Sequence, residues 1–338
     1  MLKEFNLKDF TISLQSTHIQ LNISFLNKLL KVASKSLDPH KNKTFCNCIN
    51  CPINKNKGVS TTVYGWMKGY RTIPFSKLVK IMGLTNFSWK ELEQNLISIK
   101  SGIRKGEVYP VLPIHVDKDL GLIIGHIMGD GSIEKRFHSV FYSNSNLELL
   151  NEFSTCMKKI FGISPRIWVQ DKPKFGETRW LKKLNNLNNI PNGHNVGLFY
   201  PKICSDILYT LFGKFAEGKN KIISKEILDS NINFKGGFIR AFFDDEGSVS
   251  SKNYTIRFHQ DKEDILKGII KMLKERDINS NPIRYYIKQN KLRYYFNITR
   301  FEEYSKFYEI IGCTSSNKQR EFELLISGVK KNQYSKKI

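Results

Sequence analysis

The chain has 338 residues, 40% of them hydrophobic and 25% charged, which is enough to bury a core and to form two or three domains. Its formal net charge is +23, because 54 lysines and arginines face only 31 acidic residues, so we expect a polyanionic partner, with nucleic acid as the first candidate. The absence of any run of 18 apolar residues, of a signal-peptide core and of a disulfide-type cysteine framework argues against a membrane partner and predicts an intracellular protein of the cytoplasm or nucleoid.

Residues 1–110 are predicted to form a mostly helical N-terminal domain. Residues 25–36 have the apolar spacing of an amphipathic helix. Ser60 can cap a second helix that Gly69 ends, and a further helix is expected over residues 75–82. The second helix should turn its apolar side chains inward, namely Val63, Trp66 and Met67.

These last two helices resemble the recognition helix and the following helix of phage-repressor-type helix-turn-helix domains. The resemblance rests on the signature Trp-x-x-Gly-x-Arg-x-x-Pro, which the chain matches from Trp66 to Pro74. It implies that the first of them lies in the major groove of DNA and that Arg71 contacts a phosphate. The side chains that would face the groove are Thr61, Thr62, Tyr64 and Lys68. An ordinary three-helix bundle is the alternative interpretation.

A cysteine-rich stretch lies before Ser60, where the helix-turn-helix family has its second helix, and we predict a loop there. Three cysteines in the pattern Cys-x-Cys-x2-Cys and a nearby histidine could hold one structural Zn²⁺ in tetrahedral geometry. The residues concerned are His40, Cys46, Cys48 and Cys51. The alternative is three ordinary intracellular thiols beside a basic loop.

A domain boundary is predicted between residues 85 and 115. A helix over Trp89 to Ile99 is followed by a basic, glycine-containing linker at residues 100–106 and then by two prolines. We therefore begin the second region of the chain at residue 111.

The segment Gly121–Ile133 is predicted to be a helix that ends on Asp130 and Gly131. Gly131 is expected to adopt the left-handed conformation that ends many helices. A glycine in the middle of the helix, Gly125, costs roughly 1 kcal/mol relative to alanine, so the close approach of another helix should offset it. The N-terminal cap can come from Asp117 or Asp119.

The rest of the first half is expected to alternate strands and helices up to residue 220. Arg166 and Trp168 share one face of a predicted strand, and an insertion-like stretch follows at residues 171–195. The remaining predicted elements are a strand at residues 140–142, helices at residues 147–161 and 201–215, and a basic connector at residues 219–221.

A second segment, Gly237–Val249, repeats the first without a gap at a distance of 116 residues. It also opens on glycine, has a small residue at its centre, Ala241, and ends on Glu246 and Gly247. Asn233 is expected to cap this helix and Gly247 to end it in the left-handed conformation. A repeat at a fixed spacing indicates one structural unit used twice.

If the two helices pack side by side, Asp130 and Glu246 meet at ends where the helix dipoles are negative. Like charges at one place raise the pKa of one acid, and together with the helix dipoles they suggest a compensating cation. Two carboxylates with helix-end carbonyls form an oxygen ligand set that suits Mg²⁺, with Gly129 and Asp245 beside the acids. The alternative is that each acid-glycine step merely ends a helix.

The two segments resemble the LAGLIDADG motif of homing endonucleases, in the single-chain form with two motifs. The resemblance covers about residues 117–326 and implies an α+β fold of two pseudo-symmetric αββαββα halves, whose sheets form a saddle on DNA. It implies a monomer that cleaves both strands of long duplex targets with one to three Mg²⁺ ions. By motif position, Asp130 and Glu246 correspond to the metal-binding acids. The halves and the basic tail would be residues 111–220, 221–330 and 331–338.

The strands of the second half are predicted to carry a DNA-binding face. Side chains alternate along residues 254–259 and 292–299, with residues 284–288 as a third strand. Basic, aromatic and polar side chains on one sheet face suit phosphates and base edges, although a plain solvated face has the same pattern. The residues assigned to DNA binding in the two halves are Arg166, Arg257, His259, Arg284, Lys288, Arg293 and Tyr295.

Gln260 and Lys291 are candidates for the polar or basic groups that members of the family place beside the metal, and we assign both a catalytic role. The position equivalent to Gln260 holds Asn144 in the first half, which therefore lacks a lysine there. A nicking or slow enzyme is also consistent with this sequence.

Other functions stay open. A helix-turn-helix joined to a LAGLIDADG core is also the design of a bacterial sporulation regulator that binds DNA without cutting it, so a non-cleaving transcriptional regulator is the main alternative. Both acids are present here, which favours the nuclease. RNA is a further candidate partner, in a splicing-assistant role. We expect a free-standing or intron-encoded protein rather than an intein, because the chain starts with Met1 and lacks a terminal His-Asn.

Overall fold

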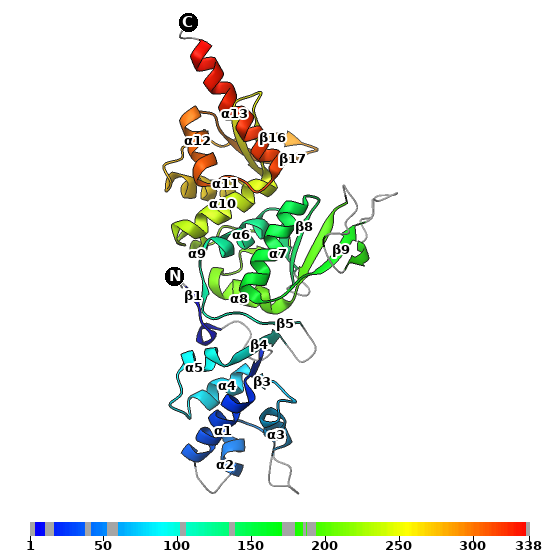
Figure 1. Cartoon of the computed structure of the whole chain (residues 1–338), viewed down its shortest axis with the longest axis vertical. Helices are drawn as coiled ribbons and strands as arrows, with labels where there is room; N and C mark the ends of the chain where they lie inside the picture. The colour runs from blue at the N-terminus through cyan, green and yellow to red at the C-terminus, as the bar shows by residue number, and fades with distance from the viewer. Residues whose placement is uncertain are drawn as a thin grey trace.

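The computed structural model describes residues 4–10, 17–37, 42–52, 60–101, 106–134, 139–170, 180–184, 187 and 194–335. These residues form three bodies that follow one another along the long axis of the molecule (Figure 1). The N-terminal body lies at one end, the next body in the chain lies in the middle, and the C-terminal body lies at the other end, with the last helix projecting from it.

The described part of the N-terminal domain combines helices with an antiparallel sheet of strand order β3-β2-β4-β5, whereas the sequence predicted a mostly helical domain. Two of these strands have only two residues each, which is too short to give a periodic pattern. The helices are α1 (Ile23–Leu37), α2 (Asn42–Cys48), α3 (Thr61–Met67), α4 (Phe75–Met82) and α5 (Trp89–Gln94). The strands are β2 (Thr17–Leu21), β3 (Ile73–Pro74), β4 (Leu96–Ser101) and β5 (Glu107–Val108).

Two predicted elements of this domain differ from the structure. The helix predicted over Trp89 to Ile99 ends at Gln94, because the following β-branched residues enter β4, where Ile99 is fully buried. The cysteine-rich stretch, predicted to be a loop, contains the helix α2. The helices α1 and α4 lie where the sequence predicted them.

Helix α3 begins and ends as predicted. The Ser60 side chain accepts a hydrogen bond from the Val63 N–H at 3.5 Å, and Gly69 has a φ of +73° just after the helix. Val63 and Trp66 are buried, but Met67 is 41% exposed. Met67 was predicted to face inward; it lies about 100° around the helix from Trp66 and about 200° from the buried Gly65, at the edge of the buried side.

The N-terminal domain is joined to the middle body by backbone hydrogen bonds. β1 (Glu4–Phe5), which precedes the short 3-10 helix η1 (Leu7–Asp9), pairs with β6 (Ile114–His115). The Tyr109 N–H donates to the Phe161 carbonyl at 2.9 Å. The predicted boundary is therefore a packed junction, although residues 102–105 of the linker lie outside the described residues.

The elements of the first half are α6 (Lys118–Met128), β7 (Gly131–Ile133), β8 (Val140–Asn144), α7 (Leu147–Phe161), β9 (Arg166–Gln170), β10 (Trp180–Leu184), β11 (Val196–Tyr200) and α8 (Lys202–Phe212). A connector follows with β12 (Ala216–Glu217), β13 (Asn220–Lys221) and α9 (Lys225–Leu228). The second half contains α10 (Ile232–Glu246), β14 (Gly247–Ser250), β15 (Thr255–Gln260), α11 (Glu263–Lys274), β16 (Arg284–Lys288), β17 (Lys291–Ile298), α12 (Phe301–Ile310) and α13 (Ser316–Ser335).

The two halves share one topology. The strand order is β7-β8-β11-β9-β10 in the first sheet and β14-β15-β17-β16 in the second, so each half has the order αββαββα. β10 is an additional edge strand in the first half. It comes from the insertion-like stretch at residues 171–195, most of which lies outside the described residues.

The offset of 116 residues extends beyond the two motif helices. Gly131 pairs with Tyr142 in the first sheet and Gly247 pairs with Phe258 in the second, and both partners are related by that offset. The helices α7 and α11 also begin at equivalent positions. The repeat detected in the motifs is therefore a repeat of the whole supersecondary unit.

The motif helices α6 and α10 run parallel and in close contact between the two halves. A side chain at Gly121 would place its Cβ 2.1 Å from a backbone oxygen of α10, and one at Gly237 would place it 2.2 Å from a backbone oxygen of α6. At Gly125 the added Cβ would lie 2.8 Å from that of Ala241. The prediction that the small central residues allow two helix backbones to approach closely is confirmed.

The prediction that Gly131 and Gly247 are left-handed was wrong. They begin the strands β7 and β14, and Gly247 has an extended φ of −103°. Both positions need glycine because a side chain would not fit. A Cβ at Gly131 would lie 2.7 Å from the Ile127 Cα, and a Cβ at Gly247 would lie 2.1 Å from the Phe243 ring. Each chain segment turns directly from helix into strand without a left-handed residue.

The caps of the motif helices agree with the prediction in one case. The Asp117 side chain accepts a hydrogen bond from the Leu120 N–H at 3.1 Å, as expected for α6. Helix α10 is capped by Asn231, which accepts from the Phe234 N–H at 2.9 Å, and not by Asn233. The helix begins at Ile232, one residue before the predicted cap.

The backbone of α13 is helical as far as Ser335, into the predicted basic tail at residues 331–338. Its first part contacts β14 and α12. Within the described ranges, none of the helices combines the length and the apolar character that a bilayer span requires.

Gly121→Ala is expected to lower the free energy of unfolding. Alanine gains about 1 kcal/mol of helix propensity, but the new Cβ forces α6 and α10 apart, and overpacking of this kind costs about 1–3 kcal/mol or more. Urea denaturation measures the difference. Gly328→Ala in α13 is the control, since its Cβ would meet only the Tyr254 ring at 3.8 Å, and its stability should stay equal or rise. Equal behaviour of the two variants would contradict the packing argument.

Candidate functional site

Asp130 and Glu246 lie at the same end of the α6–α10 pair. Because the two helices are parallel, their C-terminal ends meet; Asp130 follows α6 and Glu246 is the last residue of α10. The two carboxylates are close enough to repel each other. Both lie where the helix dipole is negative, which disfavours a carboxylate by about 0.3–1 kcal/mol at each end.

Each acid is held by an amide of its own half. Asn144 Nδ2 donates to Asp130 Oδ2 at 2.9 Å, and Gln260 Nε2 donates to Glu246 Oε1 at 3.3 Å. Asn144 and Gln260 are the last residues of β8 and β15, and they too are 116 residues apart. The structure thus brings the predicted Gln260 to Glu246 and gives the first half an equivalent pair.

A third carboxylate, Asp245, lies behind Asp130, and its side chain is completely buried. It accepts hydrogen bonds from the Tyr142 hydroxyl at 2.8 Å and from the Asp130 N–H at 3.3 Å, and it contacts His126 Nδ1 at 3.1 Å. Gly129 makes room for it, because a Cβ there would lie 2.5 Å from the Asp245 Cβ. The sequence placed Asp245 beside the metal; the structure uses its carboxylate to support the Asp130 backbone.

His126 compensates the charge of Asp245. Burial lowers the pKa of this histidine, but the carboxylates of Asp245 and Glu152 outweigh burial and raise the pKa to about 9, so the ring is a buried cation at neutral pH. Glu152 lies 3.3 Å from His126 Nε2 and also pairs with Arg240 of α10. Burial, with repulsion by Asp245, raises the pKa of the Tyr142 hydroxyl, which therefore stays protonated and donates.

Lys221, at the end of β13, was not predicted to belong to the site. Its ammonium donates a hydrogen bond to the Gly129 carbonyl, a group that the sequence analysis assigned to metal binding. Burial lowers the pKa of Lys221, and the nearby carboxylates of Glu246, Asp130 and Asp245 oppose this shift. The site therefore contains a partly dehydrated cation among three carboxylates.

Lys318 has the equivalent position in the second half. It donates to the Phe243 and Asp244 carbonyls at 2.7 and 2.6 Å, at the end of α10. Lys221 follows the last residue of α8 by nine residues, and Lys318 follows that of α12 by eight. A lysine soon after the last helix of each half is the signal that could have revealed both residues, but the two lie 97 residues apart and so do not obey the offset of 116.

The two candidate acids resist ionisation. Loss of hydration inside the site raises the pKa of Asp130 to about 7, with further repulsion from Asp245 and Glu246 and an opposing effect of Lys221. The pKa of Glu246 is also raised, mainly by burial. Asp130 nevertheless keeps an exposed edge, so a ligand can reach it from solvent although protein atoms surround most of the carboxyl group.

Lys291 is not brought to the acids. It is exposed at the turn of the β16–β17 hairpin, where it pairs with Lys288. Gln260, which contacts Glu246, pairs with Tyr294. Lys291 lies three residues farther along β17, roughly 10 Å away at about 3.3 Å per residue.

The predicted DNA-binding residues of the second half share one face of the sheet. The strand register places Arg257 opposite Asn297 and Tyr295 opposite both His259 and Arg284. Arg257 Nε donates to Asn297 Oδ1 at 2.9 Å, and its guanidinium carbon lies 4.6 Å from the centre of the Tyr295 ring. The Arg257 side chain is therefore held in place along this face.

Further cations extend the same face toward the hairpin. Arg293 lies opposite Tyr286 and forms a salt bridge with Asp261 at 2.9 Å. Lys288 and Lys291 face each other at the end of the hairpin, and every residue of β16 is exposed. The face is thus cationic along its whole length.

The first sheet has a different outer face. Arg166 is exposed at the start of β9, opposite Phe199, and Trp168 follows on the same side. Phe199 pairs with Phe141, with ring centroids 4.7 Å apart. Phe141 occupies the position that is equivalent to Arg257, so an aromatic surface in one half corresponds to a cationic one in the other.

In the N-terminal domain, Thr61, Tyr64 and Lys68 are exposed on α3, and the Lys68 ammonium lies 5.8 Å from the centre of the Tyr64 ring. Thr62 and Arg71 line a groove beside the same helix. The helix-turn-helix assignment stays a prediction.

The cysteines predicted to hold zinc do not converge. Cys46 and Cys51 are buried in the core, whereas Cys48 is exposed. Lys77 Nζ donates to Cys51 Sγ at 3.2 Å. His40 lies outside the described residues, and within the described part of the chain no three histidine, cysteine or acidic side chains form a metal-binding group.

Comparison with known proteins identifies the type of domain that contains the site. The family described as the LAGLIDADG-like domain matches residues 117–203 and 233–312, which include α6 and α10 with both acids. This match confirms the predicted fold class, an α+β protein with two LAGLIDADG halves. The N-terminal domain lies outside the match.

Several solved structures are similar to the chain at low identity. Mesophilic variants of the homing endonuclease I-DmoI are 13% identical, covering 58% of this chain and 96% of theirs, with a TM-score of 0.39. The homing endonuclease I-WcaI bound to its DNA recognition sequence is 16% identical, covering 61% and 87%, with a TM-score of 0.42. The N-terminal LAGLIDADG domain of DUF199/WhiA is 16% identical, covering 58% and 82%, with a TM-score of 0.36.

One curated protein is also similar in sequence. The DNA-directed RNA polymerase subunit Rpo1C of Methanocaldococcus jannaschii is 26% identical over 217 residues, which is 64% of this chain. The match spans only 22% of the length of that subunit.

Asp130→Asn is expected to stabilise the protein above neutral pH in the absence of divalent metal. Because the pKa of Asp130 is raised, ionisation destabilises the folded state as pH increases from about 4, and this effect is complete above pH 7. Thermal unfolding should give a higher midpoint for the variant at pH 8 and a vanishing difference toward pH 4. Asp264→Asn, at a side chain that is 94% exposed, is the control and should show no such trend. A variant that is less stable at pH 8 would contradict the electrostatic interpretation.

Proposed function

We propose that this chain, in which residues 117–203 and 233–312 form a LAGLIDADG-like domain, is an endonuclease that hydrolyses phosphodiester bonds of duplex DNA with a divalent metal. The observation that carries the proposal is the meeting of Asp130 and Glu246 at the joined ends of α6 and α10. Each acid comes from one half of the chain, so a site between the halves suits a substrate with two related strands.

The chemistry of the acids fits a divalent cation. Three carboxylates crowd at helix ends that already carry partial negative charge, and the pKa values of Asp130 and Glu246 are raised. Among the described residues, no cage of three protein ligands is present here. Mg²⁺ is commonly held by one or two carboxylates together with water and substrate phosphates, so Asp130 and Glu246 suffice.

The chain's own residues have distinct proposed roles. When bound, the metal would polarise the phosphate and favour ionisation of an attacking water. Asn144 and Gln260 would orient the two acids by holding one oxygen of each carboxylate. Lys221 would stabilise the negative charge that develops on the phosphate, because a fixed cation in a site with little water acts strongly. Asp245 would act as a positioning residue.

The cationic face of the second sheet would bind the DNA backbone. Arg257 is already held by Asn297 and Tyr295, so it loses little conformational freedom when it meets a phosphate. The aromatic face of the first sheet, with Phe141 and Phe199, would contact the other part of the target. The exposed side of α3 is a proposed additional duplex contact.

The central test is cleavage of a library of duplex DNA with Mg²⁺. Wild-type protein should cleave, and the variant with both Asp130→Asn and Glu246→Gln should bind but not cleave, because these changes remove the ligand charges and keep the shape. Mg²⁺ should also raise the unfolding temperature of the wild type and leave that of the variant unchanged. At saturating protein, Lys291→Gln should retain cleavage, because Lys291 belongs to the cationic face but is not brought to the acids.

Three outcomes of this experiment are informative. Cleavage that persists in the double variant would overturn the assignment of the acids. Equally tight binding by both proteins with no cleavage by either would instead support a non-cleaving transcriptional regulator. Loss of cleavage in Lys291→Gln would overturn the placement of Lys291 outside the site.

Arg257→Ala is expected to weaken duplex binding and to reduce the slope of log affinity against log salt concentration by about 0.9, as for the loss of one phosphate contact. Lys271→Ala removes the same charge from α11, which packs on the other face of the sheet, and serves as the matched control. Binding measured over a salt series distinguishes the two. An equal slope change in both variants would indicate a general charge effect and contradict the assigned face.

A further inference from the structure

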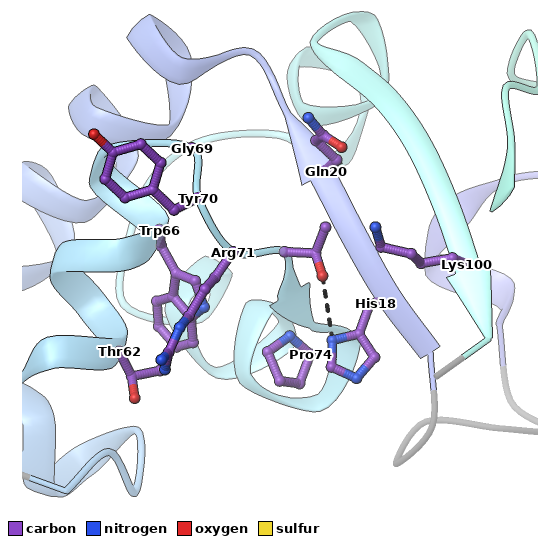
Figure 2. A pocket seen from close by; sticks show the side chains of 10 residues that line it. His18, Gln20, Thr62, Trp66, Gly69, Tyr70, Arg71, Pro74 and Lys100 are labelled. Carbon is purple, nitrogen blue, oxygen red and sulfur yellow. Dashed lines mark hydrogen bonds between the residues drawn. The ribbon is translucent and has the colours of Figure 1, made fainter. Parts of the chain in front are cut away.

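A groove in the N-terminal domain lies apart from the acids. It has a volume of about 590 Å³ and lies between α3 with its following turn on one side and the strands β2 and β4 on the other (Figure 2). Ligand pockets of proteins commonly measure about 300–1,000 Å³. Among the described residues that line it, there is no aspartate or glutamate. Its polarity therefore suits an anionic ligand.

The sheet provides one wall of the groove. His18 on β2 pairs with Lys100 on β4 and with Pro74 on β3, so these side chains lie next to one another on one face. Gln20 follows on the same face, two residues along β2. His18 Nδ1 lies 3.5 Å from the Thr72 hydroxyl, and burial lowers the pKa of the imidazole. His18 therefore offers neutral hydrogen-bonding atoms at pH 7, and the charge of this wall comes from Lys100.

The opposite wall holds an arginine in a fixed position. The stem of Arg71 packs against Gly65 of α3, where an added Cβ would lie 3.0 Å from Arg71 Cδ. The side chain runs along the helix, with its guanidinium beside Thr62 (Figure 2). Within the described ranges, Arg71 has no carboxylate within salt-bridge distance. Its hydrogen-bond donors are thus available to a ligand, and a planar guanidinium is well suited to phosphate.

The groove also has a loosely held second cation and an exposed aromatic ring. The Lys100 ammonium is 3.9 Å from Glu107, a long distance for an ion pair. Tyr70 is 80% exposed at the rim, next to Arg71 in the chain. Exposed aromatic rings beside cations are the usual platform on which proteins stack unpaired bases.

We propose that this groove binds one unpaired nucleotide of a nucleic-acid strand. Arg71 and Lys100 would take the phosphate, Tyr70 would stack on the base, and Gln20 with His18 would contact the base edge. An unpaired nucleotide fits because its base edge is free, whereas paired bases keep these edges inside the duplex. The site is separate from Asp130 and Glu246, so it does not depend on the proposed cleavage.

The test uses the full-length protein and a fluorescent four-nucleotide thymidylate strand, with binding measured by anisotropy. Tyr70→Ala should weaken binding roughly tenfold, as is usual for the loss of a stacking ring. Arg71→Ala should weaken it and reduce the salt slope by about 0.7, the value for one phosphate of a single strand. Lys80→Ala, an exposed lysine of α4 outside the lining, is the matched control and should bind as the wild type does.

Gly65→Ala separates binding from folding. It leaves every charge of the groove in place and favours the helix, but its Cβ displaces the Arg71 stem. We expect weaker strand binding with an unchanged or higher unfolding midpoint. If Gly65→Ala lowers the unfolding midpoint and weakens binding, partial unfolding explains the weaker binding. The Arg71→Lys variant then tests the proposal, because it keeps the charge and loses the planar guanidinium. It should bind the strand more weakly at an unchanged unfolding midpoint.

Three results would overturn the proposal. Unchanged strand binding in both Tyr70→Ala and Arg71→Ala would show that the groove is not used. An equal loss of affinity for a hairpin duplex and for the strand would show that the groove contacts the backbone of paired DNA instead. A strand with 5-iododeoxyuridine should cross-link to the peptide that contains Tyr70; cross-links found only on the sheet of the second half would also contradict the proposal.

Discussion

The contact between α6 and α10 is the constraint on which the site depends. Gly121, Gly125 and Gly237 remove the side chains that would keep the two helix backbones apart, and this brings the C-terminal ends of both helices together. Because the acids follow directly from those ends, their separation is set by helix packing and not by flexible loops. The same geometry excludes side chains at Gly131 and Gly247, where each chain segment turns from helix into strand.

This packing concentrates negative charge, and the fold compensates it only in part. His126 is a protonated partner for Asp245, and Lys221 and Lys318 bind the carbonyls at the helix ends. Asp130 and Glu246 keep raised pKa values in spite of these cations. The protein's own cations therefore neutralise the negative charge of this site incompletely, and the unfavourable ionisation of the two acids lowers the stability of the folded state.

Much of the fold followed from the sequence because one strong signal, the repeat at 116 residues, specifies the two helices, their contact and the acids at their ends. Asn144 and Gln260 obey the same offset and could be placed. Lys221 does not obey this offset, since it lies where the two halves differ in length, so only its place soon after the last helix of its half could have revealed it. Asp245 looked like a ligand because burial is invisible in the motif. No pattern in the sequence could fix the distance between Lys291 and the acids, and the strand register places this lysine opposite Lys288 at the turn of the hairpin.

The outer faces of the two sheets are chemically unlike, with Phe141 in the position that Arg257 occupies in the other half. The pseudo-twofold axis therefore relates the folds of the two sheets but not the chemistry of their outer faces. Any ligand that spanned both sheets would meet aromatic rings at one end and guanidinium groups at the other.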